Sequence, residues 1–157
     1  MTEKTFQIVH NIPSPYRLHM FSLLNKLVKE VGLRFHVHFM AVGHSDRQHW
    51  NGLSNNIDFP HTFWRDYPGR IGNHSFHFNT GIMHSVASQK VDFLMLGGIW
   101  DSITNTWLAL NSKANKKIAW IEGNRYASIN HGKLALAIKR RLIMKCTHVA
   151  VPGQEGK

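Results

Sequence analysis

The sequence has little cysteine, few acidic residues and no long hydrophobic run. Its single cysteine, Cys146, excludes an internal disulfide and any zinc cluster built from cysteines, and it permits a reducing compartment. No apolar run approaches the roughly 20 residues that cross a bilayer. Residues 1–5 lead into a strand-like run without the basic and apolar regions of a signal peptide. We therefore expect a cytoplasmic protein.

The shortage of acids leaves a formal net charge of +10, with 19 basic and 9 acidic residues. Between Lys113 and Lys145 there are nine basic residues and one acid, Glu122. Such a stretch attracts phosphates, whether on nucleic acid, on anionic lipid or on a phosphorylated substrate. No helix-turn-helix, RNA-recognition or zinc-finger pattern accompanies the charge. We do not expect nucleic acid as a partner, although a stand-alone basic binding module stays an alternative.

Apolar periodicity predicts alternating strands and helices in a chain of 157 residues, about the size of one domain. Strands are expected over 6–10, 33–40, 59–64, 91–96, 117–121 and 148–151, and helices over 15–31, 79–89, 102–114 and 132–145. Residues 65–76 contain Pro68, Gly69 and Gly72 and are expected to form a long loop. The alternation predicts an α/β fold with an open, mostly parallel sheet flanked by helices, which is Rossmann-like.

Three helices carry apolar residues at helical spacing, and we expect the stripe of the last of these helices to pack on the sheet. The members of these stripes are Met20, Leu23, Leu24, Leu27, Val28 and Val31 in the first helix, Ile103, Trp107 and Leu110 in the third, and Leu134, Ile138 and Leu142 in the last.

The loop after the first strand, residues 11–17, is stiffened by Pro13 and Pro15. Ser14 is the expected N-cap, and Pro15 the first residue of the helix. Free helix N–H groups and Arg17 would then face the crevice at the carboxyl ends of the strands, which suits an anionic or polyhydroxyl ligand. The alternative is that this loop is only a rigid helix start.

Four segments occur in a characteristic order: Pro-Ser-Pro-Tyr-Arg at 13–17, Val-Asp-Phe-Leu-Met-Leu-Gly-Gly-Ile-Trp at 91–100, Ala-Trp-Ile-Glu at 119–122 and Ala-Val-Pro-Gly at 150–153. Their order and spacing resemble the N-terminal domain of family 4 glycosyltransferases, which have the GT-B architecture of two Rossmann-like domains. The resemblance covers nearly the whole chain. It implies an acceptor-side domain at 1–151 and the start of a linker to a second domain at 152–157.

The resemblance implies a hexosyltransferase type of enzyme in polysaccharide biosynthesis. The acceptor would be a glycan or a lipid-linked acceptor, and the nucleotide-sugar donor would bind mainly to the second domain, typically through a Glu-x7-Glu motif. The glutamates present, Glu3, Glu30, Glu122 and Glu155, do not have that spacing. The family's Gly-Gly loop after the first strand is also missing. We therefore expect no turnover by this chain alone, and a non-catalytic subunit of a split transferase is an alternative.

The loops at the carboxyl ends of the strands supply the candidate acceptor site. Its expected members are Pro13, Ser14, Tyr16, Arg17, Gly98, Trp100, Asp101, Asn124 and Arg125. Glu122 is the candidate catalytic carboxylate, which would orient an acceptor hydroxyl or act as a base. The alternative is that Glu122 only pairs with Arg125 or a nearby lysine.

Twelve histidines raise the question of a metal, since His36 and His38 share one face of a strand. No third or fourth ligand is indicated by spacing. We predict no metal and no cofactor.

The helix expected over 132–145 has a second stripe in which two apolar residues flank two basic ones: Leu136, Lys139, Arg140 and Ile143. This pattern is typical of a helix that lies on an anionic membrane. The resemblance to family 4 glycosyltransferases, many of which rest on the inner membrane surface, implies a peripheral place on that face. The alternative is a solvated basic face, with Leu136 and Ile143 packed under a neighbouring helix or against the second domain.

Overall fold

A computed structural model describes residues 3–43, 57–67, 69–71, 74–99, 102–122 and 133–151. Its main sheet has six strands in the order β3-β2-β1-β6-β7-β8, and every neighbouring pair is parallel. The strands are β1 (Lys4–His10), β2 (Leu33–Phe39), β3 (His61–Phe63), β6 (Phe93–Gly97), β7 (Lys116–Trp120) and β8 (His148–Ala150). The predicted α/β, Rossmann-like fold with an open parallel sheet is confirmed.

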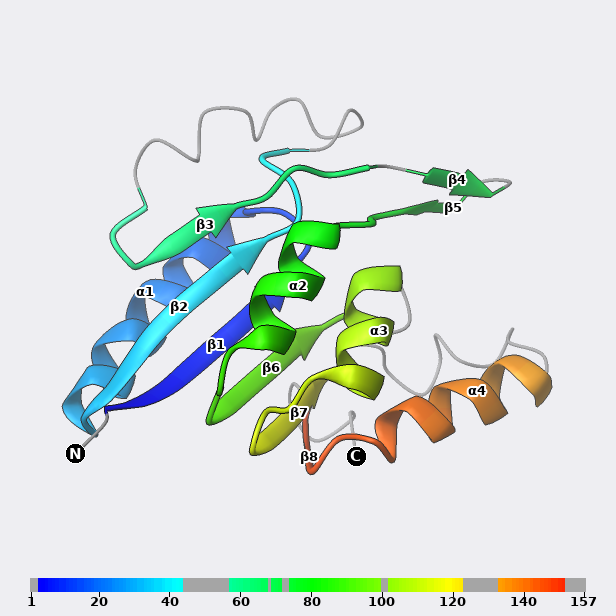
Figure 1. The fold of residues 1–157 in the computed structure, drawn as a ribbon. Helices are drawn as coiled ribbons and strands as arrows, with labels where there is room; N and C mark the ends of the chain where they lie inside the picture. Colours follow the sequence, from blue (N-terminus) through cyan, green and yellow to red (C-terminus); the bar gives the residue numbers. More distant parts are fainter. Residues whose placement is uncertain are drawn as a thin grey trace.

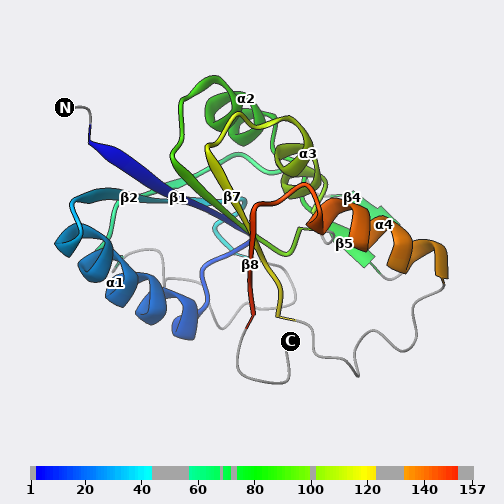
Figure 2. The ribbon, with the colours of Figure 1, turned by 90° about the horizontal axis from the view of Figure 1, so that it is seen from below.

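Helices cover both faces of this sheet. They are α1 (Pro15–Glu30), α2 (Thr80–Ser88), α3 (Ile103–Asn111) and α4 (Lys133–Ile143). Figure 1 shows α2 and α3 in front of the sheet with α1 behind it, and Figure 2 shows the same two layers from below. Helix α4 contacts α3 and lies at the β8 side of the sheet. This arrangement produces two cores, one on each face.

The core under α2 and α3 contains aliphatic residues of the central strands, among them Val9, Leu94 and Leu96. The core under α1 is rich in aromatic rings, with Phe21 in contact with the rings of Phe39, Phe59 and Trp120. Strands buried on both faces need apolar residues throughout, which explains why the central strands read as apolar runs.

Helix α1 begins at Pro15, as predicted, and ends at Glu30, one residue before the predicted end, but its apolar spacing does not mark the buried face. Leu23, Leu27 and Val31 are exposed, whereas the sheet-facing residues are Arg17, Phe21, Asn25 and Val28. The buried face contains Phe21 and Arg17 because Phe21 packs among the aromatic rings and Arg17 lies over Trp120. The spacing of the leucines cannot predict these long-range contacts.

The predicted loop over residues 65–76 is also wrong in part. It contains two short strands, β4 (Gly69–Ile71) and β5 (His74–Phe76), which pair antiparallel in a separate two-stranded sheet. Figure 1 shows this hairpin projecting away from the main sheet, beyond the carboxyl ends of the strands.

Helix α3 is shorter than predicted, and of its predicted apolar stripe Trp107 packs against the core. It ends at Asn111, and Ile103 and Leu110 are exposed while Leu108 and Ala109 are buried. Hydrogen bonds determine which face of α3 is buried. Ser102 caps the helix by accepting from the Asn105 N–H at 3.3 Å, and the Asn105 side-chain amide donates to the carbonyl of Gly97. These bonds turn a polar residue toward the sheet.

The predicted sheet-facing stripe of the last helix is wrong for two of its three residues. Leu142 is buried, but Leu134 is 76% and Ile138 52% exposed. Helix α4 lies beside α3 at the edge of the fold, so little of the sheet is within its reach.

Candidate functional site

The strand order reverses at the centre of the sheet. Strands β2 and β3 follow on one side of β1, and β6, β7 and β8 lie on the other. The loops that leave the carboxyl ends of β1 and β6 therefore run in opposite directions, which is where open α/β sheets form their ligand crevice.

The loop after β1 leads directly into α1. Ser14 occupies the predicted N-cap with an extended backbone (φ −124°, ψ 152°), and Pro15 is the first helical residue. The Ser14 hydroxyl makes no capping hydrogen bond, and it is buried without a partner among the described residues. Pro13 is buried as well, whereas Tyr16 is 60% exposed. The start of the helix is therefore fixed by the proline geometry and by packing rather than by a side-chain cap.

Arg17 is a charged residue buried in the first turn of α1. Its guanidinium carbon lies 3.9 Å from the centre of the Trp120 ring and 4.6 Å from that of Tyr16. The guanidinium also forms an ion pair with the Glu122 carboxylate. Cation–π contact and charge pairing together offset the cost of burying a guanidinium.

Glu122 lies two residues beyond the end of β7, and its side chain is 47% exposed, against 6% for Arg17. Within the described part of the chain its partner is Arg17 and not a lysine. The other partner considered from the sequence, Arg125, lies outside the described residues. The pair joins the loop after β1 to the loop after β7. One side of the carboxylate remains accessible to a ligand.

His10, the last residue of β1, belongs to the same cluster and was missed from the sequence. Its ring stacks on Trp120, with the centroids 5.5 Å apart, and meets the edge of Phe21. Burial, and secondly the charge of Arg17, lower the pKa of His10 to about 3. The sequence feature that could have identified His10 is its position: it is the polar residue that ends the strand at which the strand order reverses.

Gly97 makes room for this histidine. A Cβ at position 97 would lie 2.6 Å from Nδ1 of His10, which is closer than side-chain carbons pack. The next residue, Gly98, has a φ of +68°, and its N–H donates to the carbonyl of Trp120 at 3.4 Å. The paired glycines therefore hold the end of β6 against both β1 and β7.

Of the predicted site residues, Pro13, Ser14, Tyr16, Arg17, Gly98 and Glu122 are described. The structure brings Arg17 into contact with Tyr16 and Glu122. Trp100, Asp101, Asn124 and Arg125 lie outside the described residues.

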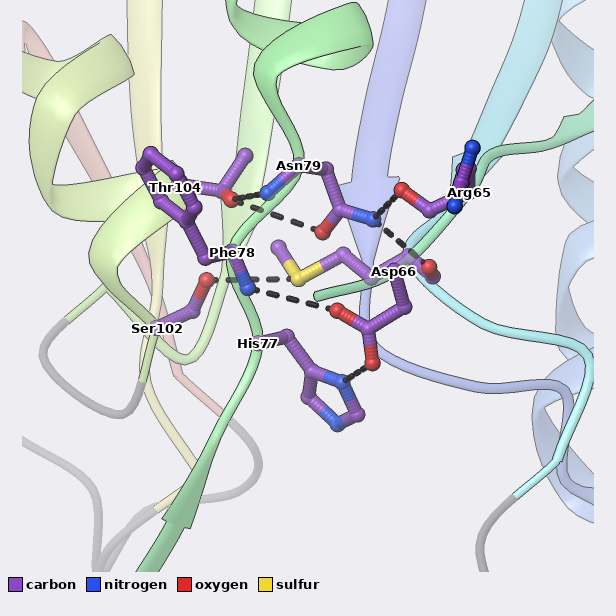
Figure 3. A network of polar contacts seen from close by, with 8 residues as sticks. Arg65, Asp66, His77, Phe78, Asn79, Ser102 and Thr104 are labelled. Carbon is purple, nitrogen blue, oxygen red and sulfur yellow. Dashed lines mark hydrogen bonds and ion pairs between the residues drawn. The ribbon is translucent and has the colours of Figure 1, made fainter. Parts of the chain in front are cut away.

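A second polar cluster connects the loops on the other face of the sheet (Figure 3). Its centre is Asn79, the fully buried N-cap of α2. The Asn79 amide donates to the carbonyls of Met40, at 2.8 Å, and Arg65, at 2.9 Å. Thr104 of α3 donates to Asn79 Oδ1 and accepts from its backbone N–H. This cluster fixes the starts of α2 and α3 relative to the ends of β2 and β3.

Asp66 and His77 extend this cluster toward the β4–β5 hairpin. Nδ1 of His77 lies 2.6 Å from an Asp66 carboxylate oxygen, and the other oxygen accepts from the Phe78 N–H. Because these residues flank the two hairpin strands, the pair closes the base of the hairpin (Figure 3).

His36 and His38 share one face of β2, as predicted, and their rings lie 4.6 Å apart. In the described part of the chain, no group of three or more His, Cys, Asp or Glu side chains is placed to hold a metal ion. Both imidazoles are instead bonded to protein groups: His36 to Thr62, and His38 to Gln7 and Trp64.

Helix α4 carries the predicted membrane-facing residues. Leu136 and Arg140 are exposed, whereas Lys139 and Ile143 are partly buried. Leu134 and Ile138 add exposed apolar surface between the basic residues. Among the residues that the structure describes, no helix is long and apolar enough to span a bilayer.

No family model, curated protein or solved structure matches this chain. What the site can do chemically therefore follows from its own residues and their geometry.

Proposed function

We propose that the chain is the acceptor-side domain of a glycosyltransferase, which moves a sugar from a nucleotide-sugar to a glycan or a lipid-linked acceptor. The observation that carries the proposal is the Arg17–Glu122 ion pair at the reversal point of the sheet. The resemblance of residues 13–17, 91–100, 119–122 and 150–153 to family 4 glycosyltransferases supports it.

The geometry suits a sugar hydroxyl. The half-exposed Glu122 carboxylate is held in place by Arg17, so its free lone pairs have a fixed direction and can accept a hydrogen bond from a hydroxyl. The exposed ring of Tyr16 lies against the same guanidinium and offers a face on which a sugar ring can pack. In this proposal Glu122 orients the acceptor hydroxyl.

The proposal requires a second domain for the donor. Transfer develops charge on the leaving nucleoside diphosphate, which cationic or dipolar groups must stabilise in a closed cleft. We place those groups on a second Rossmann-like domain or on a separate subunit, and we expect the isolated chain to be inactive.

Glu122→Gln should lower kcat for transfer about tenfold, equivalent to about 1.4 kcal/mol, because the neutral amide loses Arg17 and holds the hydroxyl less firmly. The gene should be expressed at full length and assayed with UDP-glucose, UDP-N-acetylglucosamine and GDP-mannose on membrane-extracted acceptors. Product is detected by mass spectrometry.

Glu30→Gln is the matched control, because Glu30 is exposed at the far end of α1, and it should leave kcat unchanged. Transfer at an ordinary enzymatic rate by the 157-residue chain alone would contradict the two-domain proposal. A Glu122→Gln enzyme with full activity would remove the assigned role of the carboxylate.

We also propose that α4 rests on an anionic membrane, on the cytoplasmic face. Its exposed leucines stand among Lys133, Arg140 and Arg141, so apolar insertion and attraction to lipid phosphates act on one helix. Within the fold, α4 packs beside α3 and leaves this surface uncovered by the described residues.

Replacing Leu136 and Arg140 together by serine should lower binding to vesicles that contain phosphatidylserine by at least about tenfold, since both apolar area and a charge are lost. Co-sedimentation measures the bound fraction. Leu27→Ser, at a leucine of α1 that is 59% exposed, is the control and should bind as the unchanged protein does. Equal binding to neutral and anionic vesicles, or tighter binding to a mixed oligonucleotide, would contradict the proposal.

A further inference from the structure

A groove lies on the sheet face opposite α1, between α2 and the strands β1, β2 and β3. Its volume is about 480 Å³, within the range of roughly 300–1,000 Å³ that small-molecule sites occupy. The groove extends along β2 from Arg34 to His38, about 13 Å at the rise of an extended strand. Its wall includes the hydrogen-bonding side chains of Gln7, His36, His38, Thr62, Trp64 and Gln89.

A chain of hydrogen bonds with a defined direction lines this groove. The indole N–H of Trp64 can only donate, and it donates to Nδ1 of His38 at 3.1 Å. Nδ1 of His38 therefore carries no proton, and Nε2 donates to the side-chain oxygen Oε1 of Gln7 at 3.2 Å. The Gln7 amide in turn donates to Gln89 at 3.4 Å. One indole thus sets the orientation of three further side chains.

The chain of bonds leaves polar groups available to a ligand. Each glutamine side chain has two amide N–H groups. Gln7 uses one of them to donate to Gln89, and Gln89 uses one to donate to the Ser85 hydroxyl. His36 uses Nε2 on the Thr62 hydroxyl at 2.9 Å, which leaves its Nδ1. The remaining groups on the groove wall include both donors and acceptors.

The middle of the groove carries no charge. Burial lowers the pKa of His38 to about 3, and it lowers that of His36 as well, so both imidazoles are neutral near pH 7. The charged residues Glu3, Lys29 and Arg34 lie at one end, where Glu3 and Arg34 pair at 3.6 Å. The wall is therefore made mainly of neutral groups that both donate and accept.

We propose that this groove binds a neutral oligosaccharide, as a site separate from the Arg17–Glu122 cluster. Sugar hydroxyls both donate and accept, which matches a wall of amides, hydroxyls and neutral imidazoles, and pre-oriented groups lose little entropy on binding. The choice of a saccharide rests on the proposed glycosyltransferase function. There the groove would hold a part of the glycan distant from the reacting hydroxyl.

The open shape of the groove favours a saccharide over a nucleobase. A nucleobase gains most from stacking when apolar faces cover both sides of its ring. Of the larger aromatic residues that line the groove, Phe35 is buried in the core under α1, which leaves the single indole of Trp64 at the carboxyl end of β3. The Trp64 ring is also held in place, because it packs directly on Gly81 of α2, where a Cβ would lie 2.6 Å from the ring.

Titration with maltotriose, cellotriose and triacetylchitotriose, followed by the indole N–H resonance of Trp64, tests the proposal. At least one trisaccharide should bind with a dissociation constant of about 1 mM or lower. Gln89→Ala should weaken binding about fivefold, and adding Thr62→Val should weaken it about fivefold again, since each change removes one neutral hydrogen bond. His84→Ala, at an exposed residue of α2 outside the groove, should have no effect.

Glu122→Gln distinguishes this proposal from the proposed function. Saccharide binding unchanged in that variant supports the groove, even if the transfer assay fails. Binding lost in that variant and kept in Gln89→Ala would place the saccharide at the carboxyl edge and overturn the groove. Failure of all three trisaccharides to bind, or binding of adenosine in their place, would overturn it too.

Discussion

Asn79→Ala should lower the free energy of unfolding by about 3 kcal/mol. The residue is fully buried, and its amide satisfies the carbonyls of Met40 and Arg65 while its oxygen accepts from Thr104. Alanine would leave the buried Met40 carbonyl and the part-buried Arg65 carbonyl without their donor, and each unsatisfied buried group costs about 1–3 kcal/mol. The loss would loosen the starts of α2 and α3 together.

Urea denaturation measures this effect, and a thermal melt should shift by about 6–12 °C for a protein of this size. The control is Asn111→Ala, at an exposed asparagine whose amide donates only within α3, to the Trp107 carbonyl. That variant should change stability by less than about 0.5 kcal/mol. An Asn79→Ala loss below about 1 kcal/mol would show that the two carbonyls find other partners.

Acid should destabilise the fold strongly through His38. Burial, and secondly the neighbouring His36, lower its pKa from 6.5 to about 3, and Nδ1 already accepts from Trp64, so a proton there would break that bond. As the pH falls from about 6.5 toward 3, the unfolded chain takes up a proton that the folded chain does not. Each pH unit in this window should cost up to about 1.4 kcal/mol, or about 2.7 kcal/mol by pH 4.5.

Urea denaturation at a series of pH values between 7.5 and about 4.5 would test this window. His38→Gln should give a flatter profile, because the titrating group is removed while an acceptor for Trp64 is kept. His10, whose pKa is lowered in the same direction, should leave part of the slope. His84→Gln, at an exposed histidine, should keep the full slope. Parallel profiles for the protein and His38→Gln would contradict the assignment.

The sequence was sufficient to predict the fold class and the strands because strand burial depends on local composition. Residues 91–96 are apolar with one exception, Asp92, and β6 lies at the centre of the sheet. Helix faces were harder to predict, since the buried face of α1 is chosen by Phe21 and Arg17 meeting Trp120, a residue about a hundred positions away. Local periodicity does not report such contacts.

The β4–β5 hairpin could have been recognised. Its strands are separated by Gly72-Asn73, a two-residue sequence that favours tight hairpin turns. Each strand has three residues, which is too short to show the alternation of apolar and polar residues that indicates a strand. In the sequence, Pro68 and the glycines therefore favour a loop.

The candidate site was predicted at the level of loops rather than contacts. Parallel topology brought Arg17 and Glu122 to one edge of the sheet, and the structure pairs them. His10 could not be assigned a role in advance, because its setting depends on the absence of a side chain at Gly97, in a strand that lies far along the chain.

The outermost strands of the main sheet have a consequence for self-association. Both β3 and β8 contain only three residues, and within the described part of the chain each is paired on one side only. Edge strands this short offer few unpaired backbone N–H and C=O groups to a strand of another molecule. The short edge strands therefore limit edge-to-edge association and the growth of aggregates.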